Sequence, residues 1–118
     1  MKALIIDDEI DICYLLSGIL RNKNIQPSYV NSISAAVPAL EKYQPEIVFL
    51  DNHLPDGMGV DLIKSIKAML PDAKLVMITA YDTAADRSRA VNEGADFFIS
   101  KPFSRDTIYQ ITDQLVPQ

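Results

Sequence analysis

The feature that most constrains the fold is an uninterrupted apolar run at residues 47–50, followed by Asp51 and a turn at residues 54–57. An apolar run of this length between turn signals is typical of a strand that is buried on both faces of a parallel sheet. In open α/β sheets, ligands bind outside the carboxyl ends of the strands, so a carboxylate at that position points into a site. We therefore expect the rest of the chain to be arranged around Asp51.

Strands and helices alternate along the whole chain. Apolar runs predict strands at residues 2–6, 26–31, 46–50, 74–78 and 96–100, and each is followed by apolar residues at helical spacing. Strict alternation implies an α/β fold, a doubly wound five-stranded parallel sheet with right-handed crossovers and helices on both faces. The length fits one domain, residues 1–118. Residues 116–118 are either a true end or the start of a linker.

Local signals predict where helices begin and which face of the first helix is buried. Ser34, Thr83 and Ser104 are each expected to cap a helix. Pro38 is expected to bend the helix after Ser34 or to shift its start, because proline removes a backbone donor. The predicted buried face of the first helix consists of Ile12, Leu15, Leu16, Ile19 and Leu20.

Composition argues against several classes of protein. The net charge of −5 disfavours direct binding to nucleic acid, because phosphate backbones are bound by basic surfaces. The apolar runs are far shorter than the roughly 18 residues of a membrane span, and the first strand ends at once in acids, unlike a signal peptide. We expect a cytoplasmic protein without membrane contact. The single cysteine, Cys13, is interpreted as a small apolar helix residue.

Polar side chains follow four of the five predicted strands. Asp7 and Asp8 follow the first, Asp51 the third, Thr79 the fourth and Lys101 the fifth, while nothing polar of note follows the second. In a flavodoxin-like (βα)5 sheet of order 2-1-3-4-5 the first and third strands are neighbours, so three carboxylates meet. Such a cluster favours a hard divalent cation, either Mg²⁺ or Mn²⁺. A hydroxyl and an ammonium opposite it suit a phosphoryl group.

These residues, together with the turn at 54–57, Thr79-Ala80 and Lys101-Pro102-Phe103, resemble a response-regulator receiver domain of two-component signalling. The resemblance covers essentially the whole chain. It implies that Asp51 is the phosphoacceptor, which attacks a phosphohistidine on a partner kinase and becomes an aspartyl phosphate. It also implies a Mg²⁺ site made of Asp8, Asp7 through water, Asp51 and the backbone carbonyl of His53. Glu9, the third acid of the first turn, is expected to be solvated.

The resemblance further implies how the phosphoryl group is held. Thr79 and Lys101 would each bind a phosphoryl oxygen, and the small side chain of Ala80 would leave room for the group. The Lys101–Pro102 peptide bond is expected to be cis, as proline allows.

Three aromatic residues would then govern the signal. Phe98 would be a switch aromatic that swings inward when Thr79 moves toward the phosphoryl group, remodelling the surface of the fourth helix, fifth strand and fifth helix. That surface is a candidate homodimer interface. His53 and Tyr81 would border the phosphoryl group and tune the rate at which water removes it.

The implied function is a phosphorylation-dependent switch rather than an enzyme, beyond its own phosphorylation and dephosphorylation. Its partners would be a sensor histidine kinase or a histidine phosphotransfer protein of a phosphorelay, with a possible output domain beyond Gln118. A haloacid-dehalogenase-type phosphohydrolase is one alternative, although that family has a second aspartate where this chain has His53. A receiver-fold interaction module without phosphorylation is another, and a flavodoxin is disfavoured because Asp7 and Asp8 would repel a bare phosphate.

Overall fold

The five predicted strands pair in parallel into one sheet of order β2-β1-β3-β6-β7, which confirms the predicted 2-1-3-4-5 topology. The strands are β1 (Lys2–Ile6), β2 (Gln26–Val30), β3 (Ile47–Asp51), β6 (Lys74–Thr79) and β7 (Phe97–Ser100). This computed structural model describes residues 1–115. The open question about residues 116–118, true end or linker, therefore lies outside the described residues.

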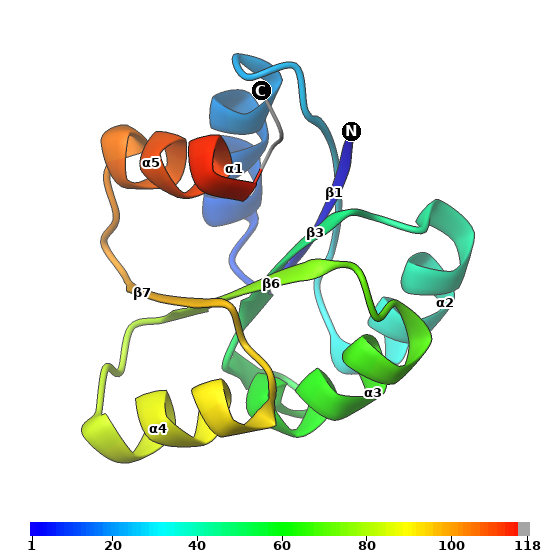
Figure 1. The fold of residues 1–118 in the computed structure, drawn as a ribbon, viewed down its shortest axis with the longest axis vertical. Helices are drawn as coiled ribbons and strands as arrows, with labels where there is room; N and C mark the ends of the chain where they lie inside the picture. Colours follow the sequence, from blue (N-terminus) through cyan, green and yellow to red (C-terminus); the bar gives the residue numbers. More distant parts are fainter. Residues whose placement is uncertain (116–118) are drawn as a thin grey trace.

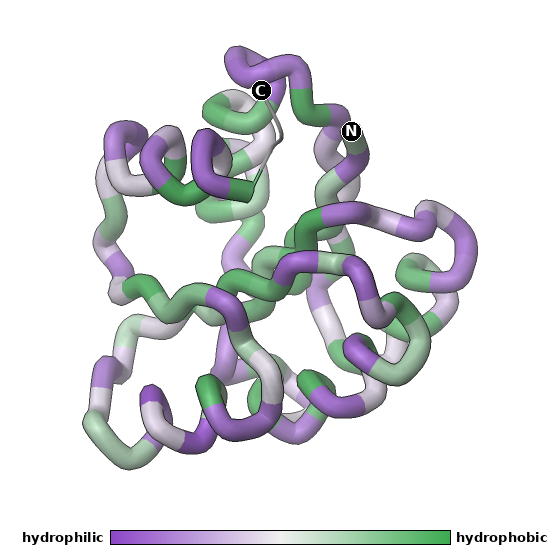
Figure 2. Tube along the Cα trace, viewed as in Figure 1, coloured by the Kyte–Doolittle hydropathy of each residue, from purple (hydrophilic) through white to green (hydrophobic). Residues whose placement is uncertain are grey.

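Helices cover both faces of the sheet (Figure 1). One face carries α1 (Ile10–Arg21) and α5 (Arg105–Leu115), and the other carries α2 (Ile33–Tyr43), α3 (Ile63–Met69) and α4 (Ala84–Glu93). Successive strand residues point to opposite faces, so Ile5 packs with the α1 and α5 side chains and Leu4 with those of the other three helices. Figure 2 shows the hydrophobic residues concentrated along the central strands. The core therefore consists of two layers that share one buried sheet.

The chain between β3 and α3 forms two elements that the sequence patterns did not predict. An antiparallel hairpin joins β4 (His53–Leu54) to β5 (Gly57–Met58), and the 3₁₀ helix η1 (Gly59–Leu62) follows it. Gly57 has φ 151°, a backbone conformation that favours glycine. The Pro-Asp-Gly turn that follows Asp51 thus closes a hairpin beside the end of β3.

Two of the three predicted helix caps are confirmed and one is wrong. The Thr83 and Ser104 hydroxyls each accept a hydrogen bond from the backbone N–H three residues ahead, at 3.1 Å. The cap of α2 is Ser32, whose hydroxyl accepts from the N–H of Ala35 at 3.2 Å, so the prediction of Ser34 is wrong. The helix starts earlier because the Asp56 carboxylate accepts from the N–H groups of Ile33 and Ser34, at 2.8 and 2.9 Å. Pro38 lies within α2.

The predicted buried face of α1 is partly wrong. Leu16, Ile19 and Leu20 are buried, but Leu15 is 52% exposed. Cys13 is fully buried instead, as the expected small apolar residue, so the buried stripe runs through Cys13, Leu16 and Leu20. Within residues 1–115, no helix is both long enough and apolar enough to cross a membrane.

Candidate functional site

The carboxyl ends of β1 and β3 bring three acids together, as the sequence predicts. Asp7, Asp8 and Asp51 each offer a carboxylate oxygen within 4.8 Å of the others. Asp7 and Asp51 are 1% and 3% exposed, whereas Asp8 is exposed. The strands are neighbours because the chain reverses its direction of winding between them, and this is where open α/β sheets bind ligands. The acids therefore form a cluster that is buried on one side and open to solvent on the other.

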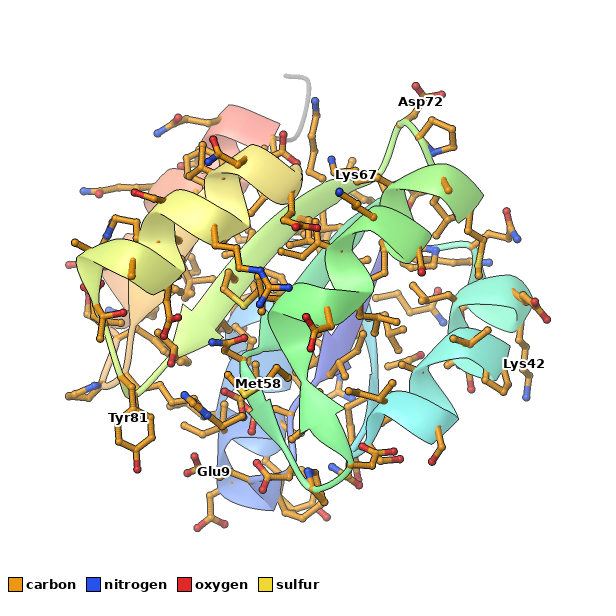
Figure 3. All side chains as sticks on the ribbon, turned by 90° about the horizontal axis from the view of Figure 1, so that it is seen from below. Glu9, Lys42, Met58, Lys67, Asp72 and Tyr81 are labelled. Atoms are coloured by element: carbon orange, nitrogen blue, oxygen red, sulfur yellow. The ribbon has the colours of Figure 1, made fainter. Side chains whose placement is uncertain are left out.

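Lys101, at the end of β7, reaches into this acidic cluster. Its Nζ lies 2.9 Å from Asp7 Oδ2, 2.9 Å from Glu9 Oε1 and 3.7 Å from Asp51 Oδ1, and its side chain is only 8% exposed. Glu9 is solvent-exposed as expected, and Figure 3 shows it at the same end of the molecule as Tyr81. Its ion pair with Lys101 is an interaction that the sequence did not indicate. One ammonium thus faces several carboxylates.

The charges of the cluster are incompletely balanced. Burial, and then the negative charge of Asp7, raise the pKa of Asp51 to about 7, while Lys101 opposes the rise. Burial also raises the pKa of Asp7, against a backbone hydrogen bond from Glu9 and the charge of Lys101. Asp7 Oδ2 is buried and accepts no well-directed hydrogen bond from the described residues, although Lys101 Nζ lies near it. Mg²⁺ binds carboxylate oxygens whose negative charge is not neutralised by the protein, so these residues fit that ion.

The backbone of Asp51 is held by the segment that follows it. The Asn52 N–H donates to Ile78 O at 3.1 Å, and its carbonyl and side-chain oxygens accept from the N–H groups of Gly59 and Val60, at 2.8 and 3.0 Å. A Cβ at Gly59 would overlap the carbonyl oxygen of Asp51. Only glycine therefore fits there, and Asn52 and Gly59 are site residues that the sequence reasoning missed. The sequence signal that could have pointed to them is the run of turn-forming residues after Asp51, with Pro55, Gly57 and Gly59.

Thr79 lies at the end of β6 and is fully buried, beside the exposed Ala80. Its Oγ1 accepts a hydrogen bond from the N–H of Tyr81 at 3.0 Å. Among the described residues, no hydrogen bond joins this hydroxyl to Asp51. The hydroxyl is therefore turned toward its own loop. The Lys101–Pro102 peptide bond, expected to be cis, is cis.

The three predicted aromatic residues lie near the site in different surroundings. The rings of His53 and Tyr81 meet edge to face, with centroids 4.7 Å apart, and Tyr81 is 63% exposed. The half-buried ring of Phe98 lies under the guanidinium of Arg87, at 4.7 Å. His53 Nε2 is buried and has no hydrogen-bond partner in the described part of the chain. His53 and Tyr81 thus pack on one another, while Phe98 lies beneath Arg87 of α4.

Arg87 also belongs to a polar network that joins α4 to β7. Its Nη2 donates to Asp82 Oδ2 at 2.6 Å, and the Ser100 hydroxyl donates to the same oxygen at 2.6 Å. Asp82 lies in the loop that begins at Thr79. The network therefore connects the loop, the helix that covers Phe98, and the strand that ends in Lys101.

The end of β2 carries a polar residue that the sequence reasoning missed. Asn31 Nδ2 donates to the backbone carbonyl of Asp7 at 2.8 Å and lies 3.7 Å from Cys13 Sγ. The expectation that nothing polar of note follows the second strand is therefore wrong. β2 ends at Val30, one residue earlier than predicted, which places Asn31 at the strand end.

This fold and these strand-end residues define a receiver domain. A family model described as the response regulator receiver domain matches residues 3–113, and the chain belongs to this family. The chain is 35% identical over 105 residues to the phosphate regulon transcriptional regulatory protein PhoB of Escherichia coli (strain K12). That match covers 87% of this chain and 46% of PhoB, so the chain spans about half the length of this curated relative.

Solved structures of response regulators have the same fold. A two-component response regulator from Clostridium difficile superposes with a TM-score of 0.93 at 27% identity, over 98% of this chain and 94% of that chain. The beryllofluoride-activated NtrC4 receiver domain dimer gives a TM-score of 0.91 at 29% identity, over 97% and 94%. The predicted family and fold class are thus confirmed.

Proposed function

We propose that this domain is a phosphorylation-dependent switch in which Asp51 accepts a phosphoryl group from a phosphohistidine of a sensor kinase or a histidine phosphotransfer protein. The observation that carries the proposal is the meeting of Asp7, Asp8 and Asp51 with Lys101, 3.7 Å from Asp51. In the transfer, a carboxylate oxygen of Asp51 forms a bond to phosphorus and the nitrogen–phosphorus bond of the donor breaks. Its electron pair returns to the imidazole. Such transfers depend mainly on positioning and charge neutralisation.

The chain's own residues divide the work of holding the reacting groups. Asp8, Asp7 through water, Asp51 and the His53 carbonyl would hold Mg²⁺, which when bound supplies positive charge between the acids and the phosphoryl oxygens. Lys101 would bind one phosphoryl oxygen. Thr79 would bind another after its hydroxyl leaves the N–H of Tyr81, and Ala80 would leave room for the group.

Movement of Thr79 would pass the signal to the surface of α4, β7 and α5. Thr79 begins the loop that contains Asp82, and Asp82 binds both Arg87 and Ser100. Arg87 covers Phe98, the switch aromatic of this proposal. A change of the loop would therefore alter the contacts above the Phe98 ring and the surface that partners meet. The NtrC4 receiver, which is similar to this chain, is a dimer in its activated form, and a homodimer through this surface is part of the proposal.

A kinase needs a surface beside Asp51 on which to dock. Leu15 is exposed on α1, and with Ile19 and Phe103 it lines a pocket of about 390 Å³ between α1 and the start of α5. Phe103 follows Lys101 by two residues, so this pocket adjoins the site. We place the kinase there, in the cytoplasm. An output domain that follows residue 118 is also proposed, since the chain matches 46% of a transcriptional regulator.

The two alternatives are less well supported. A haloacid-dehalogenase-type phosphohydrolase needs a second acid two residues after the nucleophile, and this chain has His53 there, with its ring edge to face with Tyr81. An interaction module that is never phosphorylated has no need of an acidic cluster so buried that the pKa of Asp51 reaches about 7. Turnover of a small phosphoester would favour the first alternative, and failure to form any adduct would favour the second.

Acetyl phosphate tests the proposal. The intact mass of the protein should rise by one phosphoryl group only when Mg²⁺ is present, and hydroxylamine should remove the adduct. Asp51→Asn should abolish the adduct, whereas Asp96→Asn, at the opposite end of the sheet, should form it as the wild type does. An adduct that survives in Asp51→Asn would refute the assignment of the phosphoacceptor.

The contact between His53 and Tyr81 leads to a second test. His53→Ala should speed the hydrolysis of the phosphorylated protein severalfold, because the paired rings of His53 and Tyr81 would shield the phosphoryl group from water. Tyr14→Ala, which changes an exposed tyrosine on α1, is the control. The loss of the adduct is followed by intact mass after the phosphodonor is removed. Equal decay in all three proteins would reject the tuning role.

A further inference from the structure

The Asn31 side chain connects the edge of the sheet to the acidic cluster. Asn31 follows β2, the edge strand, and Nδ2 donates to the backbone carbonyl of Asp7 at 2.8 Å. Asn31 is half-buried, and this hydrogen bond spans 24 residues of sequence.

The Asn31 bond takes the place of the next hydrogen bond of the β1–β2 ladder, which the backbone does not form. The Asp7 N–H donates to Val30 O at 3.1 Å, which is the last bond of the parallel ladder. In a continuing ladder, the carbonyl of Asp7 would accept from the backbone N–H of Ser32. Ser32 instead caps α2, and the Asn31 amide takes that place. The chain can therefore leave the sheet at Asp7 without losing a buried hydrogen bond.

Nearly every polar atom of Asp7 is fixed by a partner. Its N–H is bound by Val30, its carbonyl by Asn31 and by the Cys13 thiol at 3.4 Å, and Oδ1 by the Glu9 N–H at 2.9 Å. Among the described residues, Oδ2 alone accepts no well-directed hydrogen bond, and it faces Lys101. The fixed atoms orient Oδ2 toward Lys101 and the site.

We propose that Asn31 is a positioning residue: its amide anchors the Asp7 carbonyl and so holds the Asp7 carboxylate in place to receive the divalent cation. The inference rests on the proposed function, since it concerns the same cation site. Asn31 itself touches neither the cation nor the phosphoryl group. Partners that orient metal ligands in this way commonly change metal affinity by about 10-fold or more when they are removed.

The test compares Mn²⁺ binding by the wild type, Asn31→Ala and Asn31→Leu, measured by water-proton relaxation. Asn31→Leu fills nearly the same volume without a donor, so it remains informative if Asn31→Ala folds poorly. Asn92→Ala, which changes an exposed asparagine on α4, is the matched control. We expect about 10-fold weaker binding in both Asn31 variants and none of this loss in the control. The metal-free melting temperature of each variant shows whether the fold is retained.

A second readout needs no substitution. In the wild type, the NMR resonances of the Asn31 side-chain amide should shift when Mg²⁺ is added, because the bonded carbonyl belongs to Asp7, which would hold the ion through water. The positioning role would be overturned if the folded Asn31 variants bind Mn²⁺ as the wild type does, or if the Asn31 amide resonances do not shift on addition of Mg²⁺. The proposed function would stand in either case. A wild type that binds neither ion would overturn the proposed function and this inference together.

Discussion

Asp51 and Asp96 lie at opposite ends of the same sheet, and their surroundings differ. Asp96 Oδ2 accepts hydrogen bonds from Lys67 Nζ and from the N–H of Leu75, both at 2.8 Å. Burial raises the pKa of Asp96, but these hydrogen bonds outweigh it, so the pKa lies below its usual value. At Asp51, burial and a second acid dominate, and the pKa rises to about 7. Figure 3 shows the two ends, with Lys67 and Asp72 at one and Glu9 and Tyr81 at the other.

The difference separates a charge that stabilises the fold from charges whose ionised forms cost stability. The carboxylate of Asp96 ties β6 and β7 to α3, and its ionised form stabilises the fold. The carboxylates of Asp7 and Asp51 share Lys101, and their ionised forms are costly in the absence of a cation. We infer that the buried acids at the carboxyl end of the sheet lower the stability of the protein and form a binding site, a trade-off that is common at functional sites.

The largest expected effect comes from removing the shared ammonium. Lys101→Met leaves buried acids without their cation, which should lower the free energy of unfolding by about 4 kcal/mol near pH 8. The loss should shrink near pH 5, where Asp51 binds a proton. Urea denaturation with EDTA present measures both values. Lys67→Met, at the other end of the sheet, is the control. Its loss of unfolding free energy should be the same at pH 8 and pH 5, because carboxylates such as Asp96 ordinarily titrate below pH 5. If the loss of stability in Lys101→Met is the same at both pH values, Asp51 does not gain a proton between them, and the contrast with Asp96 fails.

Asp51→Asn should have the opposite sign, stabilising the metal-free protein. The folded state holds a proton on Asp51 that the unfolded chain has already released, so native stability falls as pH rises from the ordinary value of 3.8 to about 7. Above that range the asparagine variant should be more stable by about 2 kcal/mol, which is less than the full linkage because the neighbouring acids share protons. The difference between variant and wild type is followed by urea denaturation across the pH range. A destabilised Asp51→Asn variant near pH 8 would show that this carboxylate is structural.

Asp96→Asn should have the smallest effect, and it should destabilise. It weakens the hydrogen bonds to Lys67 and Leu75, at a cost of about 1 kcal/mol near neutral pH. Because its folded pKa is lowered, its contribution is present above the ordinary carboxylate range and is lost as pH falls through the folded pKa. The amount of phosphoryl adduct should not change. An Asp96→Asn protein that is folded but not phosphorylated would mean that the two ends are coupled.

Sequence patterns predicted the repeating parts of this fold well. Apolar runs located the five sheet strands to within about one residue, because strands covered by helices on both faces must be apolar. The convergence of Asp7, Asp8, Asp51 and Lys101 was predicted by placing the alternating strands in the 2-1-3-4-5 order of a flavodoxin-like sheet. The strands could be predicted because periodicity is visible in the sequence, and the site because alternating strands and helices fit a known sheet order.

The errors arose where long-range contacts decide between local alternatives. Ser32 and Ser34 both have the chemistry of a helix cap, and Asp56, far along the chain, selects Ser32. The helical period places Leu15 and Cys13 equally near the edge of the apolar stripe, and packing against the sheet buries Cys13. Asn31 gave no local signal at all, because its partner is a backbone carbonyl 24 residues away.

Amide NMR shifts on addition of Mg²⁺ and beryllofluoride, a phosphoryl analogue, test the central claim most directly. We predict that large shifts cluster at Asp7, Asp51, Thr79 and Lys101 and continue into α4 and β7. We also predict little change around Asp96 and the pocket at the opposite end, which Pro45, Met69 and Leu70 help to line. Shifts centred on that opposite end, or none at Asp51, would contradict the assignment of the acidic cluster as the phosphoryl and cation site.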